Sequence, residues 1–116
     1  MRIRFDAQLK QLGEEMTHMG GLIESAIQDA TQAFLNQDVE TAKRVMAEDE
    51  YIDQAQKKIE NICFQLLIQQ QPVARDLRTI TAAMKMVTDM ERIGDHATNI
   101  AEWVIFSLDN KGDGNP

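Results

Sequence analysis

The segment of residues Asp89–Ile100 reads DMERIGDHATNI. Its apolar residues recur at helical spacing and continue the pattern of the residues on either side. Glu91 and Asp95 are four residues apart, so they lie one turn apart on the same face of the predicted helix. A second acidic pair with this spacing, Asp49 and Asp53, occurs upstream.

On either side of this segment, the sequence predicts long helices, three in all, and little else. Apolar residues alternate at spacings of three and four over residues 3–35, 39–70 and 73–108, whereas the alternation typical of strands is absent. Short connections make neighbouring helices antiparallel, so we predict an all-α, elongated, up-down-up three-helix bundle. We expect residues 1–108 to form a single domain and residues 109–116 a loop or frayed end.

Two short breaks separate the predicted helices. Residues 36–38 interrupt the first stripe, and Asp38 is a good N-cap for the next helix. Pro72 disfavours helical backbone at the residue before it, so the second helix should end there. Pro72 itself suits the first position of the third helix. Gly20 and Gly21 lie inside the first helix, where such glycines usually mark a close approach to the backbone.

Composition excludes several classes of function. The chain is 43% hydrophobic and 27% charged, with a net charge of −7, which argues against nucleic acid because phosphate binding needs a basic surface. No apolar run reaches the roughly 18 residues of a membrane span, and residues 1–6 lack the apolar stretch of a signal peptide. We therefore expect a cytoplasmic protein with no direct membrane insertion. The single Cys63 agrees with a reducing compartment and is expected to be a buried small hydrophobe.

The two acidic pairs are predicted to lie at one level of the bundle. Counted from Gln71, the centre of the first pair lies about 20 residues before the turn and that of the second about 22 after it. In an antiparallel hairpin this is an offset of about 3 Å along the axis. The same count places Gly20, Gly21 and Glu24 of the first helix at this level.

A cation would relieve the repulsion that this arrangement creates. Asp49 and Glu91 interrupt otherwise apolar stripes, and a buried carboxylate needs a partner or a shifted pKa. We predict that Asp49, Asp53, Glu91 and Asp95 bind Fe, Mn, Mg or Zn, with Glu24 and Asn99 as additional ligands or as partners of the ligands. The alternative is that these acids are exposed, or form salt bridges with Arg78, Lys85 or Arg92.

The sequence gives little support to an enzyme. The Glu-x-x-His motif of di-iron bundles is absent, and neither serine in the predicted helices has a histidine at a neighbouring helical position. His18 and His96 are expected at the edge of the bundle. A free-standing metal-binding or redox protein and a plain helical oligomerisation module both stay open as alternatives to a regulatory adaptor.

Four short motifs give the chain a family resemblance. They are MGGLIE at 19–24, DEYID at 49–53, QQPVARDLR at 70–78, and MERIGD at 90–95 followed by NIA at 99–101. In this order and at this spacing they resemble the PhoU family of phosphate-signalling regulators, over about residues 5–105.

The resemblance implies a function and a set of partners. Members of that family are cytoplasmic helical adaptors, not enzymes. They couple the ATPase subunit of a phosphate ABC transporter to a phosphate-sensing histidine kinase, and so restrain phosphate uptake and phosphate-starvation genes. Some bind multinuclear metal clusters through Glu/Asp-x-x-x-Asp motifs, which match Asp49 with Asp53 and Glu91 with Asp95.

Two further points follow from the resemblance. Arg75, Asp76 and Arg78 match a family motif, and we assign them to a polar surface or to partner contact. The usual family member carries two tandem repeats of the three-helix unit, whereas this sequence carries one, which a homodimer could complete.

Overall fold

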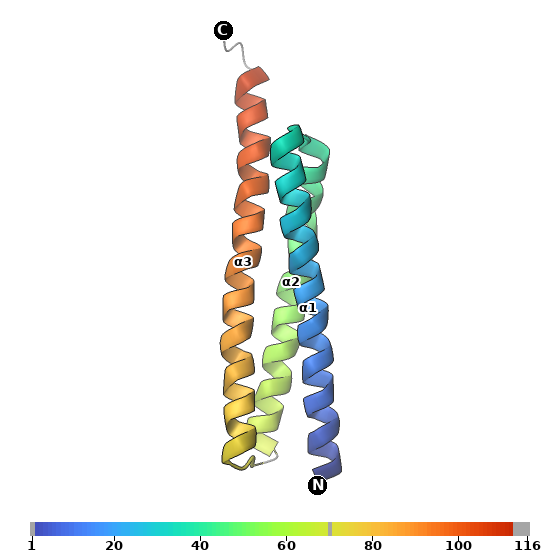
Figure 1. Cartoon of the computed structure of the whole chain (residues 1–116), viewed down its shortest axis with the longest axis vertical. Coiled ribbons are helices and arrows are strands. Elements are labelled where there is room, and N and C mark those ends of the chain that lie inside the picture. Colours follow the sequence, from blue (N-terminus) through green and yellow to red (C-terminus); the bar gives the residue numbers. More distant parts are fainter. Residues whose placement is uncertain (1, 70, 113–116) are drawn as a thin grey trace.

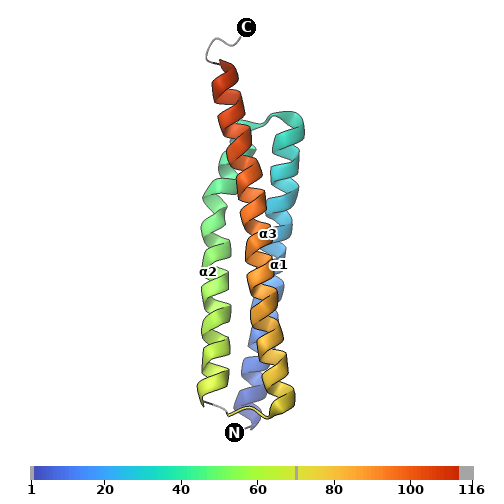
Figure 2. The ribbon, with the colours of Figure 1, turned by 90° about the vertical axis from the view of Figure 1, so that its left-hand side faces the viewer.

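The computed structural model describes residues 2–69 and 71–112 of the chain (Figure 1). Its described residues form three helices and no strand: α1 (Arg2–Asn36), α2 (Val39–Gln69) and α3 (Ala74–Gly112). The helices run up, down and up, and the two turns lie at opposite ends of the bundle (Figure 2). The molecule measures 68 × 17 × 16 Å. The predicted all-α, elongated three-helix architecture is therefore confirmed.

The helix bounds differ from the sequence prediction mainly at the end of α3. The prediction ends this helix at residue 108 and assigns 109–116 to a loop, but α3 continues to Gly112. Its last turns extend past the α1–α2 turn (Figure 1), so no packing stripe marks them. The helix continues there because each added residue gains a hydrogen bond and no proline intervenes. The rest of the predicted tail, and the predicted last residue of the second helix, Gln70, lie outside the described residues.

The first turn is built by Gln37 and Asp38. Gln37 has a φ of 52°, and the N–H of Asp38 donates to the carbonyl of Ala33 at 3.0 Å, which is the closing bond of a Schellman motif. Asp38 then caps α2, as predicted: its carboxylate accepts bonds from the N–H and the hydroxyl of Thr41 at 3.2 and 2.6 Å. The hydrogen bonds from Thr41 hold the pKa of Asp38 below its usual value.

The second turn corrects the predicted start of the third helix. Gln71 has a φ of 44°, and the carbonyl of Val73 accepts the first helical bond from the N–H of Leu77 at 2.9 Å. Val73 is therefore the N-cap, and Pro72 precedes the helix instead of occupying its first position. Both residues at positive φ are glutamines, so no glycine in the sequence marked these turns.

An ion pair between Arg2 and Asp76 links the start of α1 to the start of α3. Nη1 of Arg2 lies 2.7 Å from Oδ2 of Asp76, and the Arg2 guanidinium also covers the Phe5 ring at 4.9 Å. Asp76 is only 4% exposed, and the Arg2 hydrogen bond holds the pKa of its carboxyl below the usual value. This stabilisation is present above the ordinary pKa of an aspartate and is lost as the pH falls through the lowered one. Asp76 is thus buried in an ion pair within the chain, which differs from its predicted assignment to a polar surface, whereas partner contact stays a prediction.

The core follows the predicted stripes. A long cluster of buried side chains runs from the α2–α3 turn to the middle of the bundle, and a second one, rich in alanine, lies towards the α1–α2 turn. Cys63 is fully buried, as expected, and burial raises the pKa of its thiol. The third helix does not bury both of its apolar sides, however, because Met86, Ile93 and Ile100 stay 54%, 45% and 40% exposed.

The glycines do not all mark close packing. A Cβ added at Gly20 would meet only the Met90 methyl group at 3.8 Å, and one added at Gly21 would meet nothing within 4 Å. The expectation that this pair marks a close approach is therefore wrong within the bundle. At Gly94 a Cβ would lie 3.6 Å from Ile52, which is ordinary van der Waals contact.

We predict that Gly21→Ala raises the free energy of unfolding by about 0.5–1 kcal/mol, because alanine loses less backbone entropy in a helix and meets no neighbour here. Urea denaturation of the two proteins side by side measures the difference. Gly94→Ala is the matched comparison at a buried site, and its free energy of unfolding should rise by no more than that of Gly21→Ala. A loss of stability in Gly21→Ala would contradict the open surroundings of this residue.

Candidate functional site: a carboxylate cluster between α2 and α3

The four predicted carboxylates lie near one another on two helices. Asp49 and Asp53 are on α2, and Glu91 and Asp95 are on α3. Asp49 and Glu91 are half-buried, whereas Asp53 and Asp95 are exposed. The antiparallel register of the two helices, read from the spacing of the residues, is what brings the pairs to one level.

Two hydrogen bonds hold the half-buried carboxylates, Asp49 and Glu91, which we call the inner carboxylates. The hydroxyl of Thr98 donates to Oδ1 of Asp49 at 3.0 Å, and Nε2 of Gln56 donates to Oε2 of Glu91 at 2.7 Å. Each bond therefore joins α2 to α3. The Thr98 hydroxyl also lies 3.1 Å from the carbonyl of Gly94, so its single proton is shared between two acceptors.

Gln56 and Thr98 were not predicted as site residues, although the sequence carries a signal for them. Gln56 follows Asp49 by seven residues, and Thr98 follows Glu91 by seven. Both are polar residues in otherwise apolar heptad positions, where an unpaired polar group would be unfavourable. Each of the two helices thus carries two polar residues seven positions apart on its apolar stripe. Because the helices face each other in antiparallel directions, this equal spacing predicts that the polar residues of one helix pair with those of the other.

The pKa values of the exposed, outer carboxylates, Asp53 and Asp95, are raised, in part by the negative charge of the cluster. Partial burial, then the charges of Asp49, Asp95 and Glu91, raise the pKa of Asp53. Partial burial, then the charges of Glu91 and Asp49, raise the pKa of Asp95. No ion pair joins any of the four acids to a basic side chain within residues 2–69 and 71–112; Lys85, one of the candidate partners, pairs with Asp89 at 3.5 Å instead.

The donor set fits a hard cation in chemistry, although its side chains are not gathered around a single point. Carboxylate oxygens are the ligands that Mg²⁺, Mn²⁺ and iron prefer. As packed here, the described part of the chain contains no group of three or more His, Cys, Asp or Glu side chains arranged to hold a metal ion. Binding would therefore require Asp53 and Asp95, the two exposed members, to turn towards the inner pair.

The remaining predicted residues lie outside this cluster. Glu24 is exposed and lines a groove between α1 and α3, and its charge is not among the causes of the shifts at Asp53 and Asp95. Asn99 is exposed on α3 beside Trp103. Arg75 and Arg78 are exposed near the α2–α3 turn, where a partner can reach them.

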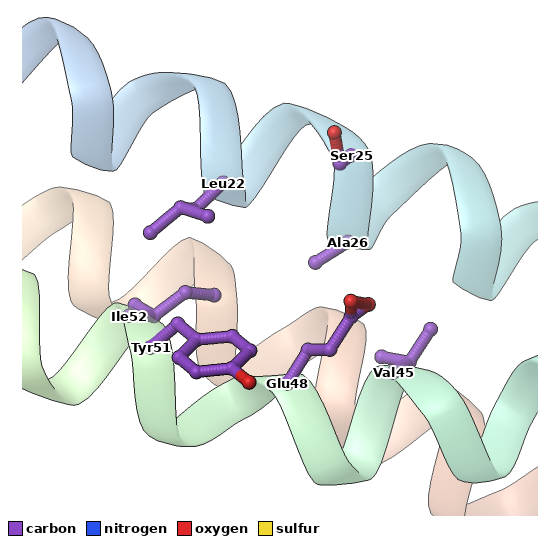
Figure 3. Close-up of a pocket in the computed structure, with 7 residues that line it drawn as sticks. All are labelled: Leu22, Ser25, Ala26, Val45, Glu48, Tyr51 and Ile52. Atoms are coloured by element: carbon purple, nitrogen blue, oxygen red, sulfur yellow. The ribbon is translucent and has the colours of Figure 1, made fainter.

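A separate hollow lies between α1 and α2 (Figure 3). It has a volume of about 140 Å³ and is lined by Leu22, Ser25, Ala26, Val45, Glu48, Tyr51 and Ile52. Its polar lining residues are Ser25, Glu48 and Tyr51. Oε1 of Glu48 lies 3.9 Å from Nε of Arg44. The mostly apolar lining indicates a gap in the packing of α1 against α2, and no feature of the sequence predicted it.

His18 and His96 are both exposed, as expected for residues at the edge of the bundle. None of the described helices combines the length and the apolar character needed to cross a membrane.

The fold and the cluster define a class of protein: a three-helix bundle with paired acidic motifs facing each other across two of its helices. The family model of the PhoU domain matches residues 16–104. The chain belongs to the PhoU family.

Relatives and a solved structure agree with this assignment. The chain is 43% identical over 99 residues to a "Phosphate-specific transport system accessory protein PhoU homolog" of Clostridium acetobutylicum, covering 84% of this chain and 45% of that one. It is 41% identical to a homolog of the same name from Aquifex aeolicus, covering 85% and 45%. A crystal structure of PhoU from Pseudomonas aeruginosa matches with a TM-score of 0.88 at 36% identity, covering 91% of this chain and 51% of that one. The chain thus spans about half the length of these relatives.

The raised pKa values predict a stability that depends on pH. Because Asp53 and Asp95 have higher pKa values in the folded chain, their charges destabilise the fold at neutral pH, and this penalty is relieved as the pH falls through the raised values. In EDTA at pH 7, we expect Asp53→Asn/Asp95→Asn to melt at a higher temperature than the parent. The difference should shrink towards pH 4. Thermal unfolding across this range measures it, and a double variant that melts lower at pH 7 would contradict the mutual repulsion.

Proposed function

We propose that the chain is a non-enzymatic regulator of phosphate uptake and phosphate-starvation signalling, acting in the cytoplasm through protein contacts. The observation that carries this proposal is the PhoU-domain match over residues 16–104, with relatives named as phosphate-transport accessory proteins. Its partners are the ATPase subunit of a phosphate ABC transporter and a phosphate-sensing histidine kinase. The chain also pairs with a second copy of itself.

The exposed pair Arg75 and Arg78 is the proposed contact with these partners. Both are exposed at the start of α3, on a protein whose net charge is −7. Such a local basic site on an acidic protein favours an acidic partner surface, because complementary potentials speed association and select the partner.

We also propose that the carboxylate cluster binds one or more metal ions of the Fe, Mn, Mg or Zn group. Asp49 and Glu91 are held by Thr98 and Gln56, and the exposed Asp53 and Asp95 are able to change rotamer. A bound cation would offset the repulsion that raises the pKa of the outer acids, and would tie α2 to α3. Metal occupancy would therefore stabilise the bundle.

Elemental analysis tests the metal proposal. After incubation with Fe, Mn, Zn or Mg and gel filtration, we expect the parent to retain metal and Asp49→Asn/Glu91→Gln to lose it. Both substitutions keep the acceptor oxygens for Thr98 and Gln56, so the fold should persist. The matched control is Glu48→Gln/Glu50→Gln, which removes the same charge from exposed positions of α2. Equal metal content in all three proteins, or none in any, would overturn the metal site.

A reporter assay tests the regulatory proposal. In a bacterium without its own PhoU-family gene, we expect the parent chain to restore repression of a phosphate-starvation promoter when phosphate is plentiful. Arg75→Gln/Arg78→Gln should lose most of this repression, because the proposed partner contact is removed. Lys10→Gln/Lys43→Gln, with the same charge change at exposed sites, is the control. Failure of the parent to repress, at a normal level of folded protein, would contradict the proposed function.

A further inference from the structure

The end of the bundle at the α2–α3 turn differs in charge from the rest of the chain. The start of α1 lies at the same end (Figure 1). We call residues 2–9, 64–68 and 71–79 the basic end, because they hold four arginines and two aspartates, a net charge of +2 on a chain of −7. Both aspartates pair with Arg2. The other three arginines are exposed: Arg4, Arg75 and Arg78.

The basic end also leaves large apolar side chains in water. Phe64 and Leu77 lie at one level, because they are seven residues before and six residues after Gln71. Apolar side chains gathered at one place, with basic groups among them, indicate a contact surface, whereas singly scattered ones do not. The apolar members are Ile3, Phe64, Ile68, Val73 and Leu77, which are 86%, 55%, 72%, 62% and 43% exposed.

The size of this end favours a lipid surface over a folded protein. The bundle measures 17 × 16 Å across, so its backbone spans a cross-section of roughly 270 Å², well below the roughly 800 Å² that each partner buries in a standard protein interface. A bilayer sets no such minimum, because binding to it strengthens with each apolar group buried and each basic group near anionic lipid.

The length of the bundle keeps acidic side chains away from such a surface. Along the three helices, the first acidic residues beyond the basic end are Glu14, Glu60 and Asp89. Glu60 is 11 residues from Gln71, or roughly 16 Å along the helix axis. This is about two Debye lengths at physiological ionic strength, so repulsion from anionic headgroups is largely screened. The net charge of the whole chain therefore does not oppose a contact made through this end.

We propose that the basic end binds the surface of an anionic lipid bilayer, with the long axis of the bundle directed away from the membrane. Ile68 and Val73 enter the boundary between headgroups and acyl chains, where apolar groups of peripheral proteins bind. Arg75 and Arg78 pair with lipid phosphates, because the long stem of arginine lies on apolar surface while its charged group stays in water. The inference goes beyond the proposed function, since it requires neither transporter nor kinase.

Sedimentation with sucrose-loaded vesicles tests the basic part of this contact. We expect the parent chain to sediment with vesicles of equal parts phosphatidylglycerol and phosphatidylcholine, and not with phosphatidylcholine alone. Arg75→Gln/Arg78→Gln should bind about 25-fold less tightly, because each arginine near an anionic surface contributes roughly fivefold. The control is Lys43→Gln/Arg92→Gln, which makes the same charge change at exposed positions outside the basic end.

A second variant tests the apolar part. Phe64→Ser/Ile68→Ser should bind the anionic vesicles about 10-fold less tightly or weaker still, because less apolar surface leaves water. Phe34→Ser/Leu35→Ser is the control, at positions 49% and 70% exposed at the opposite end of the bundle. Circular dichroism checks that every variant keeps its helices. A parent that does not sediment with anionic vesicles, or an equal loss in a variant and its control, overturns the lipid contact.

Tryptophan fluorescence tests the orientation of the bundle. Trp103 is the only tryptophan of the chain, and it contacts Phe34 near the α1–α2 turn, far from the basic end. Lipids with brominated acyl chains should quench the indole introduced by Phe64→Trp/Trp103→Phe and leave Trp103 of the parent unquenched. Quenching of Trp103 alone would overturn the proposed orientation and the basic end as the contact.

The vesicle assay and the reporter assay fail separately. Vesicles contain no protein partner, so lost repression with intact vesicle binding would contradict only the proposed function. A chain that ignores vesicles but still needs Arg75 and Arg78 for repression would assign this end to an acidic protein surface, and would overturn the lipid contact.

Discussion

Burial of the apolar stripes holds the three long helices in a single register, which sets the height of every side chain along the bundle. The described residues contain no disulfide and no sheet, and both connections are only a few residues long. A long bundle of this kind gains its stability from burial along its whole length, so a slip anywhere moves every layer. The Gln37 turn and the Asp38 cap, at one end, and the Gln71 turn, at the other, set where each helix begins. They thereby fix the height of every side chain.

The polar pairs in the middle of the bundle make this register specific. Asp49 pairs with Thr98 and Gln56 with Glu91, and each pair spans the same two helices. If α3 slipped by one heptad, Asp49 would face Glu91 and two carboxylates would meet in a half-buried layer, which is strongly unfavourable. Apolar stripes alone tolerate such a slip, because one apolar layer resembles the next. Polar residues at heptad positions remove this ambiguity.

Much of the fold was predictable because long helices repeat one simple pattern. The apolar periodicity predicted all three helices, and the composition of residues 36–38 predicted both the break and the Asp38 cap. The acidic level followed from counting residues away from the second turn. The contact between Arg2 and Asp76 was not predicted, because residues 74 apart meet only once the bundle has formed. The pairing of Gln56 with Glu91 likewise depends on side-chain rotamers, and no apolar stripe of the sequence marks the end of α3.

An odd number of helices has a consequence for joining such units along one chain. The first residue of α1 and the last turn of α3 lie at opposite ends of the bundle (Figure 1). A second unit attached by a short linker must begin where α3 finishes and therefore point the opposite way. A second unit in the same direction would need a connection as long as the bundle itself. Short-linked tandem units therefore share the antiparallel arrangement of two separate chains related by a twofold axis perpendicular to the bundle.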